Sequence, residues 1–393
     1  MLFRFKKKDW RILSLLLIST LTFHIPLPVS ANPASMDLSC QGAILVEATT
    51  GTVLYEQDAD LPLRPASVTK IMTMLLIFEA IEKGQISLED VVTISAHAAG
   101  MGGSQVYLEE NEQQTVNTLL KCISIASAND ASVAMAEYIA GSEEEFVKRM
   151  NDKANELGMT NTHFVNCCGL DADGHLTSAR DVAIMSRELI LNYPEVHDYS
   201  TIWMDEFQHV TRKGSSTFGL SNTNKLISTY PYATGLKTGS TSLAKYSVSA
   251  TATKDNVTLI AVIMADVDYK VRFTNAQKLL DYGFATCKVY SDTNPPLLAP
   301  INVDKGTQQQ VNLCYKEYFT YIDTTGANLK DIKIILSLPK SVSAPIHPSH
   351  AIGSLDYYLN EKIIGSIPIY PMIPVDKVTY KFCLLEMLYA LLP

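Results

Sequence analysis

The chain has 393 residues, of which 47% are hydrophobic and 19% are charged, and its formal net charge is -9. This length favours two domains over one, and the composition excludes an intrinsically disordered chain, which would be poorer in hydrophobic residues. The acidic balance, with no visible cluster of Lys and Arg, argues against a nucleic-acid-binding protein.

The first 31 residues have the pattern of an export signal. A basic stretch comes before the mostly apolar segment 12–23, and the small residues Val29-Ser30-Ala31 offer a cleavage site. The apolar segment is short for a membrane-spanning helix. We therefore expect residues 1–31 to be a signal peptide and the mature, exported chain to begin near Asn32, with a formal charge of -13. An uncleaved N-terminal anchor is the alternative.

The next elements alternate between strands and helices. Two short strands around a Gly-containing turn are expected at 42–47 and 52–56, which predicts a hairpin. A helix is expected from Ser67 to Lys83, and because it is apolar almost all round it should be buried. Further helices are expected at about 115–126, 130–140, 144–157 and 178–192.

From Gly235 onward the sequence favours strands again. Residues 244–252 and 256–266 are rich in Val, Ile, Thr and Ala and read as paired antiparallel strands, followed by a helix at about 272–284. Helices bracketed by early and late strands predict an α+β fold, in which both hairpins join one antiparallel sheet covered by helices.

The last hundred residues have a different amino-acid pattern from the preceding chain. After Asn294-Pro-Pro, short apolar runs alternate with Pro, Gly and Asp up to about Pro374, which predicts a small all-β domain. The final stretch, 375–393, is too short to span a membrane but apolar enough to lie at its surface. A terminal helix packed on its own domain is the alternative.

Seven cysteines, an odd number without regular spacing, do not indicate a disulfide framework. Cys167 and Cys168 lie between His163 and His175, yet adjacent cysteines do not match the usual ligand spacing of a zinc site. We expect a loop with two small, partly buried thiols there, and neither a metal nor another cofactor.

Three short motifs occur in order: Ser67-Val-Thr-Lys70, Ser127-Ala-Asn129 and Lys237-Thr-Gly239. The first two are weak alone, since a chain of this length contains on the order of one of each by chance. Indeed, a second S-x-x-K begins at Ser242 and a second S-x-N at Ser30. Ser67, however, begins a buried helix, whereas Ser242 lies at the edge of a strand.

The helical position of the first motif has a chemical consequence. Residues three apart in a helix share a face, so the Lys70 amine can reach the Ser67 hydroxyl. A serine is a weak nucleophile until a base takes its proton, and a lysine is a base only when neutral. Burial and a second cation both disfavour the charged form, and Lys237 is the candidate for that cation.

The three motifs together are the set found in class A β-lactamases and penicillin-binding proteins. The stretches around them, at 64–73, 126–131, 161–170 and 235–241, resemble the D-alanyl-D-alanine carboxypeptidases, which are low-molecular-mass penicillin-binding proteins. The resemblance implies a β-lactamase/transpeptidase-like catalytic domain at 32–288, a β-rich accessory domain at 289–374 and an amphipathic membrane-associating segment at 375–393.

The resemblance also implies the roles of the motif residues. Ser67 would attack the carbonyl of the D-Ala-D-Ala bond and carry the acyl group, while Lys70 accepts and returns the proton. Ser127 would relay a proton to the departing D-alanine, and Asn129 would bind the substrate amide and steady Lys70.

Further roles fall on the strand around Lys237 and on the last helix of the catalytic domain. Lys237 and Thr238 would face the substrate carboxylate, Gly239 would let the strand lie close to the substrate, and the backbone N–H groups of Ser67 and Ser240 would form the oxyanion hole. Some members carry histidine at position 240, which leaves the contribution of that side chain open. Arg272 matches the carboxylate-reading arginine of the family; a surface cation on an exposed turn is the alternative.

The implied activity is removal of the terminal D-alanine from peptidoglycan pentapeptides on the outer face of the membrane, with penicillins as acylating inhibitors. One rival is a β-lactamase with a deacylating glutamate, for which Glu188 is the candidate, although its neighbours Leu189 and Ile190 read as packing residues of a helix. The other is a non-catalytic receptor, which would have no need of a poised nucleophile and base.

Overall fold

The computed structural model of the chain describes residues 36–212, 214–323 and 325–390. The predicted signal peptide, residues 1–31, therefore lies outside the described residues.

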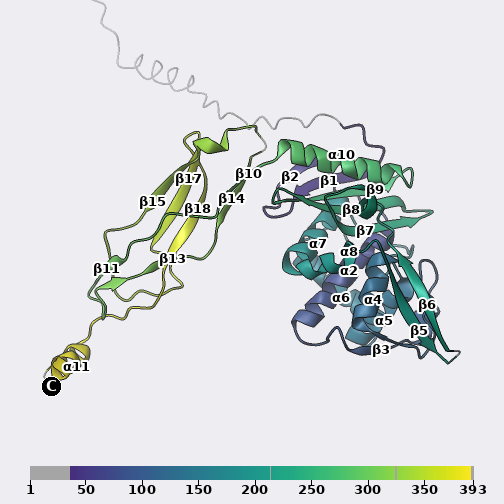
Figure 1. Cartoon of the computed structure of the whole chain (residues 1–393), viewed down its shortest axis with the longest axis horizontal. Helices are drawn as coiled ribbons and strands as arrows, with labels where there is room; N and C mark the ends of the chain where they lie inside the picture. Colours follow the sequence, from purple (N-terminus) through teal and green to yellow (C-terminus); the bar gives the residue numbers. More distant parts are fainter. Residues whose placement is uncertain (1–35, 213, 324, 391–393) are drawn as a thin grey trace, which may run out of the picture. The chain divides into compact units, whose positions relative to one another are not determined.

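A five-stranded antiparallel sheet carries the catalytic region. Its order is β2 (Val53–Gln57), β1 (Gly42–Glu47), β9 (Val257–Asp266), β8 (Lys245–Lys254) and β7 (Ala233–Thr241). The N-terminal hairpin and the late hairpin thus share one sheet, and the predicted α+β fold is confirmed. Strand β9 is mostly apolar, β8 is rich in small Ser, Ala and Thr residues, and both are largely buried because helices cover both faces of the sheet, with α10 (Val271–Thr286) on one side and α7 (Ala179–Asn192) on the other (Figure 1).

The predicted helices agree closely with the observed ones, which are α4 (Val116–Ile125), α5 (Asn129–Ala140), α6 (Glu143–Glu156) and α7. Three of them begin at a side-chain cap that the sequence shows. The hydroxyls of Thr115, Ser142 and Ser178 accept hydrogen bonds from the backbone N–H groups three residues later.

The central helix begins later than predicted. The α-helix α2 spans Lys70–Glu82 and is buried nearly all round, as expected. Ser67, however, lies in a preceding 3₁₀ turn, η1 (Ala66–Thr69), and not in the α-helix. The turn is tighter because Val68 N–H donates to the Pro65 carbonyl and Lys70 N–H donates to the Ser67 carbonyl.

Two antiparallel pairs were not expected from the sequence: β3 (Val91–Thr93) with β4 (Gln113–Thr115), and β5 (Met204–Thr211) with β6 (Gly214–Ser221). Short elements complete the catalytic region: α3 (Ala96–Ala99), η2 (Pro194–Val196), α8 (His197–Ser200) and α9 (Leu226–Thr229). The β5–β6 hairpin has few apolar residues, of which Phe207 and Leu220 are buried. Its polar composition gives no strong strand signal.

The C-terminal region is rich in strands, as predicted. It contains a β10–β14 pair, the three-stranded sheet β12-β11-β16 and the four-stranded sheet β13-β18-β17-β15. The strand bounds are β10 (Lys288–Asp292), β11 (Ile301–Asp304), β12 (Gln310–Val311), β13 (Leu313–Tyr315), β14 (Phe319–Asp323), β15 (Lys333–Ser337), β16 (Ser341–Ser343), β17 (Gly353–Leu359) and β18 (Lys362–Pro371), with one 3₁₀ turn, η3 (Leu329–Asp331).

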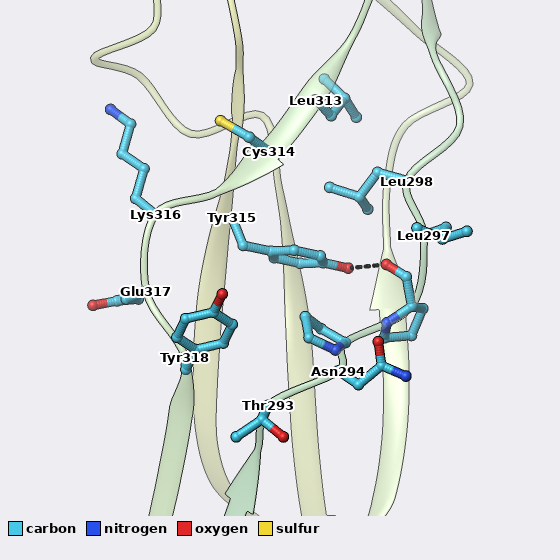
Figure 2. Close-up of a pocket in the computed structure, with 12 residues that line it drawn as sticks. Thr293, Asn294, Leu297, Leu298, Leu313, Cys314, Tyr315, Lys316, Glu317 and Tyr318 are labelled. Carbon is cyan, nitrogen blue, oxygen red and sulfur yellow. Dashed lines mark hydrogen bonds between the residues drawn. The ribbon is translucent and has the colours of Figure 1, made fainter.

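An open cavity of about 500 Å³ lies in this region, between residues 293–298 and 313–318 (Figure 2). The Tyr315 hydroxyl crosses it to donate a 3.0 Å hydrogen bond to the Pro296 carbonyl. Leu297, on its rim, is almost wholly exposed.

The described chain ends in the helix α11 (Tyr380–Ala390). Its apolar side chains Tyr380, Leu384, Leu385, Met387 and Leu388 are between 42% and 87% exposed, which does not fit a helix packed on its own domain. Among the residues that the structure describes, no helix has the length and apolar character needed to cross a membrane.

Candidate active site

Ser67 and Lys70 are held together at the start of the central helix. The Lys70 Nζ donates to the Ser67 Oγ at 3.1 Å, to the Asn129 Oδ1 at 2.6 Å and to the Cys168 carbonyl at 2.6 Å. Lys70 is fully buried, whereas Ser67 is partly open to a cleft. Three acceptors thus fix the amine beside the Ser67 hydroxyl.

The two lysines of the motifs are both buried, and burial decides their proton affinity. Burial lowers the pKa of Lys70 to about 8, although the nearby Cys168 and Cys167 thiols and Asp130 oppose that shift. Burial, followed by the positive charges of Lys70 and Arg272, lowers the pKa of Lys237 well below its usual range. Desolvation of the buried amine therefore makes a neutral, basic Lys70 accessible near neutral pH.

Ser127 and Asn129 lie at the start of α5. Ser127 takes a positive φ of 63°, which aims its side chain at the cleft, and in the described chain its buried Oγ has no hydrogen-bond partner. The Asn129 Nδ2 donates to the Gly102 carbonyl at 2.7 Å, and the Asn129 backbone N–H donates to the Ser104 carbonyl at 2.7 Å. Asn129 therefore joins Lys70 to the loop on the other side of the cleft.

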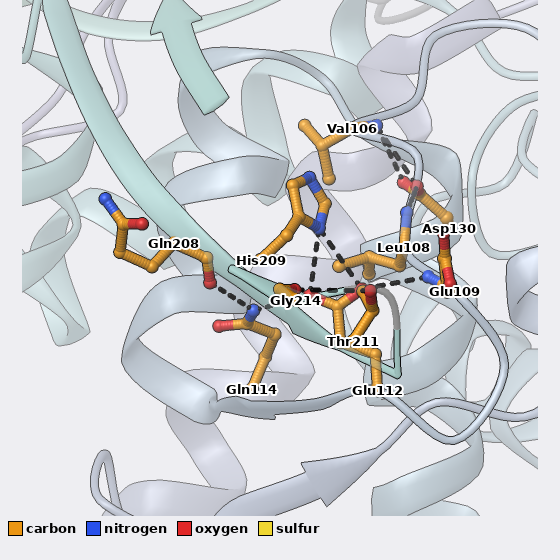
Figure 3. Close-up of polar contacts among 10 residues, drawn as sticks. All are labelled: Val106, Leu108, Glu109, Glu112, Gln114, Asp130, Gln208, His209, Thr211 and Gly214. Carbon is orange, nitrogen blue, oxygen red and sulfur yellow. Dashed lines mark hydrogen bonds and ion pairs between the residues drawn. The ribbon is translucent and has the colours of Figure 1, made fainter. Parts of the chain in front are cut away.

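Asp130, next in sequence, holds that same loop. Its buried carboxylate accepts hydrogen bonds from the Val106 N–H and the Leu108 N–H, each at 3.1 Å (Figure 3). Helix α5 thus positions the loop around Val106 and Leu108 through Asp130, a residue that belongs to none of the three motifs.

A second buried network ties the loop to the β5–β6 hairpin. The Glu112 carboxylate contacts the His209 Nδ1 at 2.9 Å and accepts from the Gln114 amide at 2.7 Å, and that amide also donates to the Gln208 carbonyl at 2.8 Å (Figure 3). Because Ser221, at the end of β6, lines the cleft, this network supports one wall of the site.

Strand β7 carries the third motif, and its glycine has a packing contact that the sequence did not reveal. A Cβ on Gly239 would lie 2.7 Å from the Pro65 carbonyl oxygen and 3.0 Å from the Ser67 nitrogen. The glycine therefore lets β7 pack against the turn that carries Ser67, and Gly239 also lines the cleft. Thr238 donates to the Thr223 hydroxyl at 2.7 Å, and Ser240 is exposed.

Arg272 lies in the first turn of α10 and is only 4% exposed. One guanidinium nitrogen donates to the Gly239 and Ser247 carbonyls at 3.1 and 3.2 Å, and the rings of Tyr246, Tyr269 and Phe273 surround the group. Its Nε has no hydrogen-bond partner in the described chain. The alternative of a surface cation on an exposed turn is therefore wrong.

These residues line or underlie one cleft of about 310 Å³. Six predicted residues line it directly (Ser67, Ser127, Thr238, Gly239, Ser240 and Arg272), and Lys70, Asn129 and Lys237 are buried. Sequence reasoning missed the remaining lining residues, Ser104, Ser221, Asn222, Thr223, Lys225 and Tyr269, which belong to no motif.

The loop that contains the adjacent cysteines was also missed as part of the site. The Cys168 carbonyl is one of the acceptors of Lys70. All seven cysteines have free thiols, and within the described ranges no group of three or more His, Cys, Asp or Glu gathers to hold a metal ion.

Comparison with known proteins gives a consistent result. Residues 29–268 match the family described as D-alanyl-D-alanine carboxypeptidase, and residues 284–377 match the penicillin-binding protein 5 C-terminal domain. The chain is 43% identical to the D-alanyl-D-alanine carboxypeptidase DacF of Bacillus subtilis, over 84% of each chain, and 34% identical to DacA of Escherichia coli, over 86% of this chain and 84% of DacA. Among solved structures, penicillin-binding protein 5 of Haemophilus influenzae superimposes with a TM-score of 0.73 at 30% identity, covering 88% of this chain and all of that one.

Proposed function

The chain belongs to the D-alanyl-D-alanine carboxypeptidase family and is a serine-type peptidase of the penicillin-binding type, and we propose that Ser67 is the nucleophile with which it removes the terminal D-alanine from peptidoglycan peptides. The observation that carries this proposal is the contact between the buried Lys70 amine and the Ser67 hydroxyl at the floor of the cleft.

Acylation begins with the neutral Lys70 amine. It takes the proton of the Ser67 hydroxyl while the Oγ attacks the carbonyl carbon of the D-Ala-D-Ala bond. The negative charge that develops on the carbonyl oxygen lies between the backbone N–H groups of Ser67 and Ser240, and each such donor contributes roughly 3 kcal/mol to the transition state. The packing of Gly239 on the turn brings these two donors to the same side of the cleft.

Departure of D-alanine requires a proton on its nitrogen. Ser127 supplies it, because its buried Oγ faces the cleft without a competing partner among the described residues. Water then hydrolyses the acyl-enzyme, with Lys70 again as the base, and Asn129 keeps Lys70 in place during both steps.

Recognition of the terminal carboxylate combines direct contact with support of strand β7. Thr238 and Arg272 line the cleft and meet the carboxylate. Lys237 is wholly buried, its pKa is lowered, and its amine donates to the Thr238 carbonyl at 3.2 Å, so it supports the strand that presents Thr238 to the carboxylate.

The β-lactamase alternative receives no support from the helix that carries its candidate base. Glu188 lies in α7, where it accepts a 2.6 Å hydrogen bond from Asn192, and it is not among the residues that line the cleft. Leu189 and Ile190 are buried packing residues. Penicillins should therefore acylate Ser67, and the acyl-enzyme that they form should be hydrolysed slowly.

The reaction takes place outside the cytoplasm, where the substrate of this family is found. We propose that residues 1–31 direct export, that the catalytic and accessory domains meet near 288/289, and that residues 375–393 bind the membrane surface. The exposed apolar side chains of α11 support the last point. Deleting residues 380–393, which spares the buried Val375 and its hydrogen bonds to Ile346 in the β-rich domain, should move the protein from the membrane fraction to the soluble fraction. Unchanged fractionation would refute the membrane role.

The catalytic proposal is tested with a peptide ending in D-Ala-D-Ala. The wild-type protein should release D-alanine, the Ser67→Ala variant should not, and Ser242→Ala, which removes the serine of the other S-x-x-K, should behave as wild type. Release by Ser67→Ala at the wild-type rate would overturn the assignment.

A further inference from the structure

Two adjacent cysteines, both fully buried, form the loop that supports the catalytic lysine. The Cys167 carbonyl accepts a 2.5 Å hydrogen bond from the Thr73 hydroxyl, one turn along α2 from Lys70. The Cys168 carbonyl accepts the 2.6 Å bond from the Lys70 amine. The backbone of the cysteine pair is thus part of the active site, whereas the proposed mechanism uses neither thiol.

The pKa values of the two thiols are shifted in opposite directions. The Cys167 thiol and then the positive charge of Lys70 lower the pKa of Cys168, whereas burial raises the pKa of Cys167. The two sulfurs belong to adjacent residues, and the lowered pKa of Cys168 favours it as the thiol that reacts first with an oxidant.

We propose that Cys167 and Cys168 are a modification site at which a hydroperoxide joins the two sulfurs in a vicinal disulfide and thereby slows acylation of Ser67. This inference rests on the proposed function of Ser67 and Lys70.

The chemistry balances in two steps. The Cys168 thiolate attacks one peroxide oxygen, the O–O bond breaks, the departing oxygen takes a proton and leaves as water, and Cys168 becomes a sulfenic acid. The Cys167 sulfur then attacks the Cys168 sulfur, the S–S bond forms, and the sulfenic oxygen leaves as a second water with the Cys167 proton. The two sulfurs lose two electrons, and hydrogen peroxide gains two.

The disulfide would disturb the site because it closes a ring that contains the peptide unit between the cysteines. Adjacent Cα atoms lie about 3.8 Å apart, closer than the roughly 4.4–6.8 Å that disulfides usually bridge, so closing the ring has to distort the peptide unit and rotate it relative to its neighbours. Both of its polar groups are engaged, the Cys167 carbonyl by Thr73 and the Cys168 N–H by the Asn166 Oδ1 at 3.3 Å. Their rotation displaces the next carbonyl, which holds Lys70, and the strained bond should be easily reduced.

The remaining cysteines do not share this arrangement. Burial raises the pKa of Cys40 to about 12 and that of Cys287 to about 11, and it also raises the pKa of Cys122. Cys314 is partly exposed and Cys383 exposed, so both are replaced by serine in the test protein to prevent disulfides between molecules.

The experiment compares acylation by labelled penicillin before and after treatment of this protein with hydrogen peroxide, which is removed with catalase. We expect the peptide that contains residues 167 and 168 to lose the mass of two hydrogen atoms, acylation to slow roughly 10- to 100-fold because the base is displaced, and dithiothreitol to restore both. The proposal would be overturned if the peptide kept its mass, or if its mass changed while the acylation rate stayed the same.

Two variants sharpen the result. Cys167→Ala keeps the backbone carbonyls and the Cys168 thiol but cannot form the ring, so peroxide should leave its own acylation rate within about twofold; equal inhibition would show that the disulfide is not responsible. If thermal unfolding shows that the Cys167→Ala variant is not folded, the Cys167→Ser variant is used in its place. An untreated protein that releases no D-alanine would instead count against the proposed function, so the two failures are distinguishable.

Discussion

Gly169 packs so closely on Ala66 that a Cβ at position 169 would lie 1.9 Å from the Ala66 carbonyl oxygen and 2.9 Å from the Ser67 nitrogen. Both residues have positive φ angles, 90° at Gly169 and 48° at Ala66. The loop that accepts the Lys70 hydrogen bond through Cys168 therefore also supports the turn that carries Ser67. One loop positions Ser67 and Lys70 together.

Replacing Gly169 tests this support. Gly169→Ala should reduce both stability, by roughly 3 kcal/mol, and acylation by penicillin, because the new Cβ meets backbone atoms and the φ is unfavourable for a side chain. Gly219→Ala is the matched control, since a Cβ added there would meet nothing within 4 Å and the φ of Gly219 is not positive; it should stay within about 0.5 kcal/mol. Thermal unfolding and penicillin labelling measure the two effects, and equal behaviour of the two variants would contradict the account.

The pH dependence of acylation follows from Lys70. Its pKa is lowered to about 8, and only the neutral amine is a base, so roughly a tenth of the enzyme is competent at about pH 7 and half at about pH 8. The second-order acylation rate should therefore rise about fivefold between these values and level off above about pH 9. Stopped-flow labelling with a chromogenic β-lactam measures it; a rate that falls with rising pH over this range would disprove the assignment of Lys70 as the base.

Arg272 should matter only for substrates with a terminal carboxylate. Arg272→Lys loses the planar guanidinium that contacts two carbonyls and three rings, so kcat/KM for a peptide ending in D-Ala-D-Ala should fall roughly 10- to 100-fold. The C-terminal amide of the same peptide lacks the charge and should show a much smaller difference between wild type and variant. Arg180→Lys, in a partly exposed ion pair with Asp60, is the control. An equal loss for acid and amide would assign Arg272 to structure alone.

The buried Glu112–His209 contact should stabilise the wall of the cleft. Glu112→Ala leaves the His209 ring and the Gln114 amide without their buried partner, which should cost roughly 3 kcal/mol in the free energy of unfolding. Glu110→Ala removes an exposed carboxylate from the same loop and should change little. Urea unfolding compares the two, and a Glu112→Ala protein as stable as wild type would be inconsistent with a supporting role.

The sequence predicted the elements whose signals are local or strongly periodic. The apolar residues on all sides of α2, the cap at Ser178 and the Val- and Ile-rich β9 each specify their structure over a short window. The resemblance to the carboxypeptidases, which rests on three motifs, is confirmed by the family match.

The rest depends on contacts between distant parts of the chain. Cys168 lies 98 residues from Lys70, and Glu112 lies 97 residues from His209, so neither pairing leaves a pattern in a local window. The need for glycine at 239 was recognised, but its partner was not, because only the folded structure brings β7 against the turn at Ser67.

The most direct test of the central claim is peptide mapping by mass spectrometry after the protein has been incubated with benzylpenicillin. The account predicts one covalent adduct, located on Ser67, which persists over many minutes and is absent from Ser67→Ala. An adduct on Ser242 or Ser127, or labelling of Ser67→Ala at the wild-type rate, would contradict it.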